Sequence, residues 1–176
     1  PEGSAARVLR ALGEAGVFRL GGVLVGTQAF TALGNVLGVK WEHAALSTQD
    51  IDIVGERTLD VALPEDTADI PAALDNLRMG FLPVPPFNPS HPSTSFKIRG
   101  KALRLDLLTP APHSTSSSPV MIHRFNAAAQ PLPFLDYLIE SPIPAGLPHG
   151  EGLLVQVPNL LAMPCINWFW PVNAAQ

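Results

Sequence analysis

The chain has 176 residues, enough for one domain with a hydrophobic core but short for two. Charged residues make up 15% of it, against roughly 25% in an average soluble domain. Its formal net charge of −4 argues against general binding to duplex DNA, which needs a basic surface. The single cysteine, Cys165, excludes an internal disulfide and a four-cysteine zinc site.

Membrane and export signals are not apparent in the sequence. Pro158 and Pro164 interrupt the apolar stretch over residues 153–170, so we expect no transmembrane helix and no membrane partner. No basic segment followed by an apolar run opens the chain, and we expect a cytoplasmic protein without a signal peptide. A first residue of Pro1 rather than Met suggests a fragment of a longer protein.

The first half of the chain alternates between helical and strand patterns. Apolar spacing predicts, in chain order, a helix over 4–15, a strand over 17–26, a helix over 27–37, a strand over 49–54 and a helix over 69–78. Ser4 is the predicted cap of the first helix. Gly26 and Thr27 therefore lie where a strand turns into a helix.

Prolines dominate the segment that follows. Five of them between residues 81 and 95 predict an extended loop. Beyond it we predict strands over 96–98 and 102–108 joined as a hairpin at Gly100, a strand over 120–122, and a short helix over 133–139 with Phe134, Leu135 and Leu138 buried.

Two aspartates alternate with two isoleucines in the segment "QDIDIV". Side chains of a strand alternate between its faces, so Asp50 and Asp52 point the same way while Ile51 and Ile53 point into the core. Neighbouring carboxylates repel each other unless a charge neutralises them, and Mg²⁺, which prefers oxygen ligands, can do so. The alternative is a solvated strand end with two aspartates that bind nothing.

A third aspartate, Asp106, lies in the mostly apolar strand segment "LRLDLLTP". It should not face the core without a partner. If this strand lies beside "QDIDIV", three carboxylates converge, as two-metal phosphoryl chemistry requires. The alternative is that Asp106 pairs with Arg104, Arg99 or a backbone amide.

Two further features suit a phosphate ligand. At Gly26 and Thr27 a phosphate could approach the backbone, a hydroxyl and a helix N-terminus, although Thr27 could instead be an ordinary helix cap. Lys97 and Arg104 belong to the densest basic cluster, and one or two of its side chains could bind a triphosphate. The alternative for that cluster is a solvated hairpin.

Taken together, "GGVLVGTQAF", "TQDIDIV" and "LRLDLLTP" resemble the nucleotidyltransferase fold of the DNA polymerase beta superfamily. The chain is more closely similar to a bacterial group of nucleotidyltransferase-fold proteins related to the toxins of abortive-infection systems. The resemblance covers roughly residues 5 to 158. It implies an α/β (α+β) fold, with a small mixed sheet, helices packed on one face and proline-rich loops. Thr27 departs from the family's commoner serine.

The resemblance also implies an activity: Mg²⁺- or Mn²⁺-dependent transfer of a nucleoside monophosphate from an NTP to an unknown acceptor, which could be a protein, an RNA or a small molecule. Asp50, Asp52 and Asp106 take the metal-ligand positions, and Gly26 and Thr27 the phosphate contacts. Two alternatives stay open, a non-catalytic binding module that keeps the fold and a glycosyltransferase that uses D-x-D to bind a metal–nucleotide sugar.

The end of the chain departs from the family pattern. We expect residues 1–158 to form the nucleotidyltransferase-like domain and residues 159–176 to be a divergent or truncated tail. The aromatic residues over 168–170 would mark a missing C-terminal region or a protein partner.

Overall fold

The structure is a computed structural model that describes residues 3–39, 49–56, 67–111, 118–147 and 152–159. Its elements in chain order are α1 (Ser4–Glu14), β1 (Val23–Val25), α2 (Gly26–Leu37), β2 (Asp50–Val54), α3 (Ile70–Asn76), β3 (Phe81–Pro83), β4 (Ser95–Ile98), β5 (Arg104–Pro110), β6 (Val120–Ile122), β7 (Ala127–Leu132), α4 (Leu135–Ile139), β8 (Ile143–Leu147) and β9 (Leu153–Val157). No helix in these ranges is long and apolar enough to cross a membrane.

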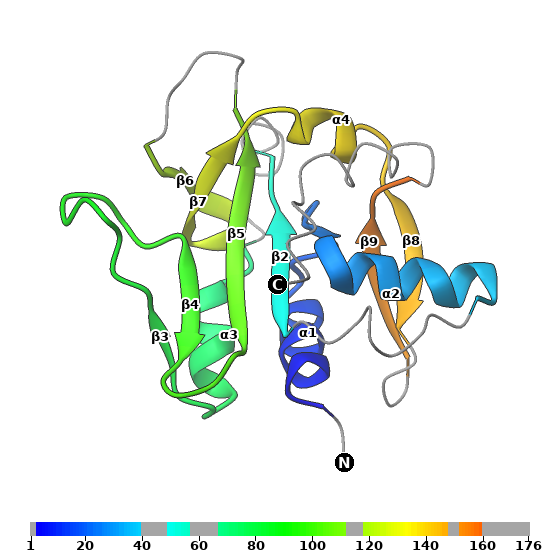
Figure 1. The fold of residues 1–176 in the computed structure, drawn as a ribbon, viewed down its shortest axis with the longest axis horizontal. Helices are drawn as coiled ribbons and strands as arrows, with labels where there is room; N and C mark the ends of the chain where they lie inside the picture. Colours follow the sequence, from blue (N-terminus) through cyan, green and yellow to red (C-terminus); the bar gives the residue numbers. More distant parts are fainter. Residues whose placement is uncertain (1–2, 40–48, 57–66, 112–117, 148–151, 160–176) are drawn as a thin grey trace, which may run out of the picture.

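A seven-stranded mixed sheet organises the chain (Figure 1). Five strands follow the order β1-β2-β5-β4-β3, while β7 pairs with the end of β5 and β6 pairs with β7. The two central strands, β2 and β5, are parallel, whereas β1 and β4 are antiparallel to their neighbours. Strands β8 and β9 form a separate antiparallel pair, which α2 crosses. The predicted α+β class with a mixed sheet is confirmed.

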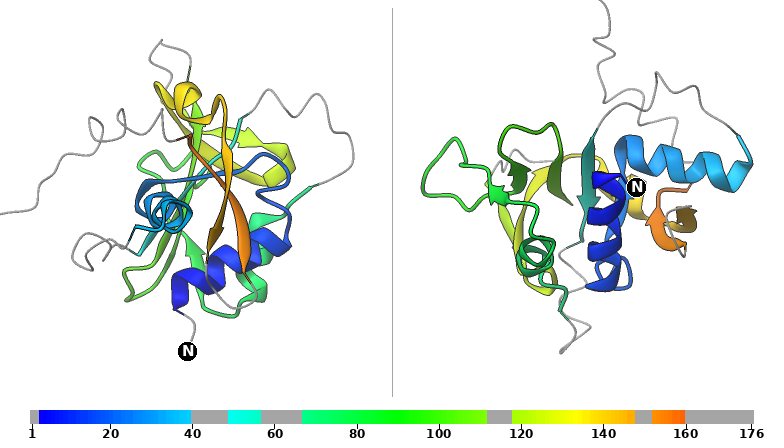
Figure 2. Two further views of the ribbon diagram at one scale, coloured as in Figure 1. Left: turned by 90° about the vertical axis from the view of Figure 1, so that its right-hand side faces the viewer. Right: turned by 90° about the horizontal axis from the view of Figure 1, so that it is seen from below.

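One hydrophobic core joins the first three helices to the sheet. Leu9 of α1, Leu33 of α2 and Leu74 of α3 belong to the same buried cluster as Ile51 and Leu105 of the central strands. Helices α1 and α3 lie against each other along the sheet (Figure 2). The five-residue α4 belongs elsewhere, because its Leu135 is clustered with Val23, Val25 and Val54. Side chains alternate between the two faces of β2, so Val54 points to the face opposite Ile51 and Ile53. This is the face that carries Asp50 and Asp52, and α4 therefore lies over it.

Local signals explain where two of the helices begin and end. The Asp69 carboxylate accepts a hydrogen bond from the backbone N–H of Ala72 at 2.8 Å, which caps α3. Gly38 ends α2 in the left-handed conformation, with φ of 67°. Helix α1 differs slightly from its prediction, since Gly3 occupies the cap position and Ser4 is the first helical residue.

Three sequence predictions are wrong in part. Residues 17–22 form turns, in which the N–H of Gly22 donates to the carbonyl of Val17 at 2.8 Å, and only residues 23–25 pair as a strand. Phe81–Pro83 forms the edge strand β3 rather than a loop. An edge strand tolerates Pro83 because the N–H that proline lacks would face away from the neighbouring strand. Phe134 is half exposed rather than buried, because it precedes α4 in the left-handed conformation.

Candidate active site on strands β2 and β5

The register of the two central strands brings the predicted aspartates to one place. Asp52 lies directly opposite Asp106, and Asp50 lies opposite Arg104. In both strands these polar residues are partly exposed and alternate with buried apolar ones, so they share one face of the sheet. The prediction that the strand of Asp106 lies beside the strand of Asp50 and Asp52 is confirmed.

Asp52 is the electrostatically strained member of this group. Its pKa is raised from 3.8 to about 7, mainly by burial and in addition by the negative charges of Asp106 and Asp50, while Arg104 acts in the opposite direction. The site therefore holds more negative charge than its own cation offsets. Because the ionised form of Asp52 is disfavoured, an added positive charge nearby would stabilise it.

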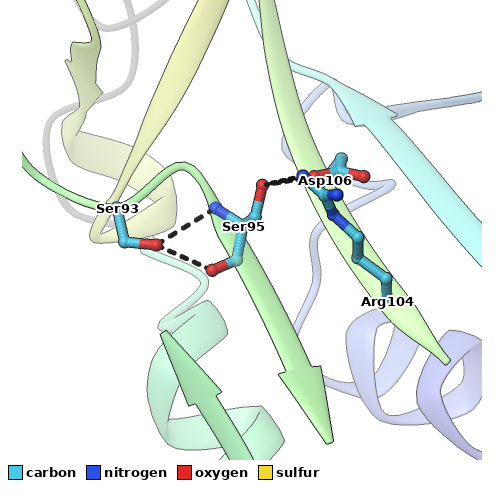
Figure 3. A network of polar contacts seen from close by, with 4 residues as sticks. All are labelled: Ser93, Ser95, Arg104 and Asp106. Carbon is cyan, nitrogen blue, oxygen red and sulfur yellow. Dashed lines mark hydrogen bonds and ion pairs between the residues drawn. The ribbon is translucent and has the colours of Figure 1, made fainter. Parts of the chain in front are cut away.

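Asp106 is held on its other side by β4 and by its own strand (Figure 3). Its Oδ1 accepts hydrogen bonds from the Ser95 hydroxyl and from Nε of Arg104, the latter at 2.8 Å. A second guanidinium nitrogen of Arg104 donates to the Ser95 hydroxyl oxygen at 3.0 Å. The pairing of Asp106 with Arg104, which the sequence left open as the alternative, is thus present in the structure.

Ser95 is a member of the site that the sequence analysis missed. It lies opposite Asp106 in the β4–β5 ladder, and Ser93 fixes the backbone beside it by donating to the Ser95 carbonyl at 2.7 Å (Figure 3). The predicted strand began one residue too late to include it. A signal existed, because a hairpin centred on Gly100 places residues 95 and 106 close to each other.

The donor set fits a hard divalent cation in kind and in charge. Three carboxylates on one face supply only oxygen, and a cation would relieve the repulsion that raises the pKa of Asp52. Ser95 and Arg104 both engage Oδ1 of Asp106, and within the described residues no hydrogen bond reaches its Oδ2. Across the same ranges, no three His, Cys, Asp or Glu side chains are placed so that they could together hold a metal ion, and this includes the three aspartates as they stand.

The start of α2 lies against the Asp52 carboxylate. A Cβ placed on Gly26 would stand 2.6 Å from Oδ2 of Asp52, and the glycine has φ of 68°. Val25, not Thr27, is the cap residue, and it makes no side-chain capping bond. Thr27 is the second residue of the helix. The strand-to-helix turn predicted at residues 26 and 27 is therefore confirmed, and it borders the aspartates.

Substituting Gly26 tests whether ligand binding depends on the close approach of α2 to the Asp52 carboxylate. Gly26→Ala is expected to weaken, about tenfold or more, the binding of Mg²⁺ and NTP that the family resemblance implies, because the new Cβ displaces Oδ2 of Asp52. Gly38→Ala is the matched control, since its φ is 67° and nothing lies within 4 Å of its added Cβ. Both variants should lose roughly 1–2 kcal/mol of unfolding free energy from the strained φ. Equal ligand affinities of the two variants, measured by calorimetry, would contradict this account.

Protonation of Asp52 should make stability depend on pH. The folded pKa of about 7 lies above the reference of 3.8, so the folded state binds this proton more tightly than the unfolded state. Unfolding free energy should therefore fall as pH rises from about 4 to about 7, by at most roughly 4 kcal/mol. Denaturant titrations in EDTA should show this fall in the wild type and lose it in Asp52→Asn. Asp136→Asn, on the exposed surface of α4, should keep it.

The two basic candidates have different surroundings. Arg104 is bound to Asp106, whereas Lys97 lies opposite Arg104 in the β4–β5 ladder with an exposed side chain. Both belong to the face that carries the aspartates. The aromatic residues over 168–170 and Cys165 lie outside the described residues.

Comparison with known proteins places this geometry in a family. The family model described as nucleotidyltransferase matches residues 4–162, which span every helix and strand of the fold. No curated protein and no solved structure matches the chain. The match includes Gly26, Thr27 and all three aspartates of the site. Because it extends over most of the sequence, the chain belongs to the nucleotidyltransferase family.

Proposed function

We propose that this protein transfers a nucleoside monophosphate from an NTP to an acceptor hydroxyl in a reaction that requires Mg²⁺ or Mn²⁺. The observation that carries the proposal is the register of β2 and β5, which sets Asp52 opposite Asp106 with Asp50 on the same face. Membership of the nucleotidyltransferase family supports transfer of this group. The glycosyltransferase alternative has no such support.

Each carboxylate has a proposed role. Asp50 and Asp52 would hold two cations, and Asp106 would complete the site of one of them. The bound cations would supply positive charge to the phosphates and lower the pKa of the acceptor hydroxyl. Asp106 would help to take the proton from this hydroxyl, whose oxygen attacks the α-phosphorus. A new O–P bond forms, and pyrophosphate leaves.

The phosphates of the donor would lie at the start of α2. The first backbone N–H groups of a helix point away from it and favour an anion. Gly26 adds no side chain there, and the Asp52 carboxylate occupies the place that its Cβ would take, so phosphates bound at the helix start would lie beside Asp52. Thr27 offers its hydroxyl in the same turn. Arg104 would orient Asp106 through the bond between Nε and Oδ1, and exposed Lys97 would contribute charge to the same face.

Label transfer tests the proposal directly. The full chain is incubated with each α-³²P-labelled NTP, with Mg²⁺ or Mn²⁺, and with protein or RNA as acceptor. Transfer of label that EDTA stops and that the Asp50→Asn/Asp52→Asn double variant lacks would support the activity. Binding of NTP and Mg²⁺ without transfer to any acceptor would instead indicate a non-catalytic module.

A further inference from the structure

A half-open cavity of about 740 Å³ lies beside Ser95 and Arg104, between the sheet and the loop over residues 84–94. Phe87, Asn88 and His91 line it from the loop, and Ser95, Arg104 and Gln130 line it from the strands. Ser95 and Arg104 are also the two residues that bond Oδ1 of Asp106. The cavity thus ends one side chain away from this carboxylate, and its size is typical of a small-ligand pocket.

The loop that walls the cavity is held in shape by its own backbone. Pro85, Pro86, Pro89 and Pro92 fix φ at four positions within ten residues. The Asn88 carbonyl accepts a hydrogen bond from the N–H of His91 at 3.0 Å, and its side-chain oxygen accepts one from the N–H of Ser90 at 3.0 Å. Figure 1 shows this loop projecting from the β3–β4 edge of the sheet. A wall constrained in this way loses little entropy when a ligand binds.

Phe87 presents an aromatic ring to solvent at this wall. Its relative exposure is 107%, the highest among the exposed large hydrophobic residues described. An aromatic side chain left fully in water has lost the burial that normally stabilises it. At the edge of a cavity, such a ring provides a flat surface on which a planar heterocycle can stack.

The residues that line the cavity itself are basic or uncharged. No Asp or Glu is among its lining residues, and its cation is Arg104, which is paired with Asp106. The adjoining β4–β5 hairpin adds Lys97, Arg99 and Lys101, and its one acidic residue is Asp106. A polycationic acceptor would be repelled here, whereas a phosphodiester would be attracted.

We infer that this cavity holds the terminal nucleotide of a single-stranded nucleic-acid acceptor. Its base stacks on Phe87, and its phosphate lies toward Arg104 and Lys97. The inference rests on the proposed function, because it places the acceptor relative to the donor. In the order β1-β2-β5-β4, the start of α2 lies on the β1 side of the aspartates and the cavity lies on the β4 side. Donor phosphates and acceptor would thus approach Asp52 and Asp106 from opposite sides.

Binding can be measured without any transfer reaction. In EDTA, fluorescence anisotropy of a 5′-labelled single-stranded RNA 12-mer should show saturable binding to the full chain. Phe87→Ala should weaken it about 5- to 100-fold, the range expected for loss of one stacked base. Lys97→Glu should weaken it as well and make it less sensitive to salt. The control variants Tyr137→Ala and Arg19→Glu, which change an exposed aromatic ring and an exposed cation outside the cavity, should bind as the wild type does.

Several outcomes would overturn the inference. It fails if the 12-mer does not bind, if Phe87→Ala binds as tightly as Tyr137→Ala, or if the same RNA as a blunt duplex binds equally well. Free AMP that binds as tightly as the strand would assign the cavity to a free nucleotide instead. If NTP without metal competes with the RNA for binding, the cavity would be assigned to the donor nucleotide instead. If label is transferred to another acceptor but RNA does not bind, the inference fails and the proposed function stands. If RNA binds but no label is transferred to any acceptor, the proposed function fails and the assignment of the cavity stands.

Discussion

Asp52→Asn is expected to reduce the proposed nucleotidyl transfer by on the order of 10³-fold or more, because the central carboxylate could no longer hold the proposed cation. Asp52 lies between Asp50 on its own strand and Asp106 on the next, and its pKa of about 7 reflects burial and both of these charges. Asparagine keeps the size of the side chain and removes its charge. Binding of NTP in Mg²⁺, measured by calorimetry, should be lost together with the transfer of label.

Stability measurements separate this effect from misfolding. Removing a partly buried charge that is repelled by its neighbours should leave Asp52→Asn at least as stable as the wild type at pH 8 in EDTA. Addition of Mg²⁺ should then raise the melting temperature of the wild type but not of the variant. The role given to Asp52 is refuted if the variant transfers label at a rate within tenfold of the wild type.

The aspartate pair could be recognised from sequence because its signal is local. In "QDIDIV" the period of two places both carboxylates on one face, and the buried isoleucines leave one orientation for the strand. The turn at Gly26 is local as well, since a strand pattern gives way there to helical spacing. Such patterns need no knowledge of which strands are neighbours.

The partners of Asp106 depended on information that the sequence does not carry locally. Whether Oδ1 meets Ser95, Arg104 or a metal is decided by the register of β4 on β5 and by rotamers, neither of which hydropathy fixes. Strands β7 and β8 escaped prediction for a related reason. "AAAQPL" and "IPAGL" contain alanine, proline and glycine, which give weak strand signals, so their pairing partners determine their structure.

The cavity beside Ser95 and Arg104 shows the same limit. The prolines predicted a loop, but a loop prediction does not say that the segment returns to β4 and walls a space over Arg104. The N–H of Val84 donates to the carbonyl of Ser95 at 2.9 Å, which ties the beginning of the loop to the strand that holds the site. A contact between residues this far apart in a proline-rich segment has no periodic signal in the sequence.

Asp106→Asn should separate binding from chemistry. We expect transfer to fall on the order of 10³-fold while the affinity for NTP in Mg²⁺ changes only a few-fold, because Asp50 and Asp52 remain to hold the donor complex. Asparagine retains Oδ1 as an acceptor, so the bonds from Ser95 and Arg104 can persist and the fold should be kept. Single-turnover label transfer and calorimetry on the same protein would measure the two effects.

Ser95→Ala provides the graded control for this variant. It removes the hydroxyl that bonds Asp106 but leaves the carboxylate and its bond from Arg104 in place. Loss of one such bond costs about 1–2 kcal/mol, so transfer should fall roughly 5- to 30-fold, well short of the effect of Asp106→Asn. If the two variants were equally impaired, Asp106 would act only through its bond to Ser95. If Asp106→Asn retained full activity, β5 would contribute no carboxylate to the reaction, and Asp50 and Asp52 alone would have to carry the metal site.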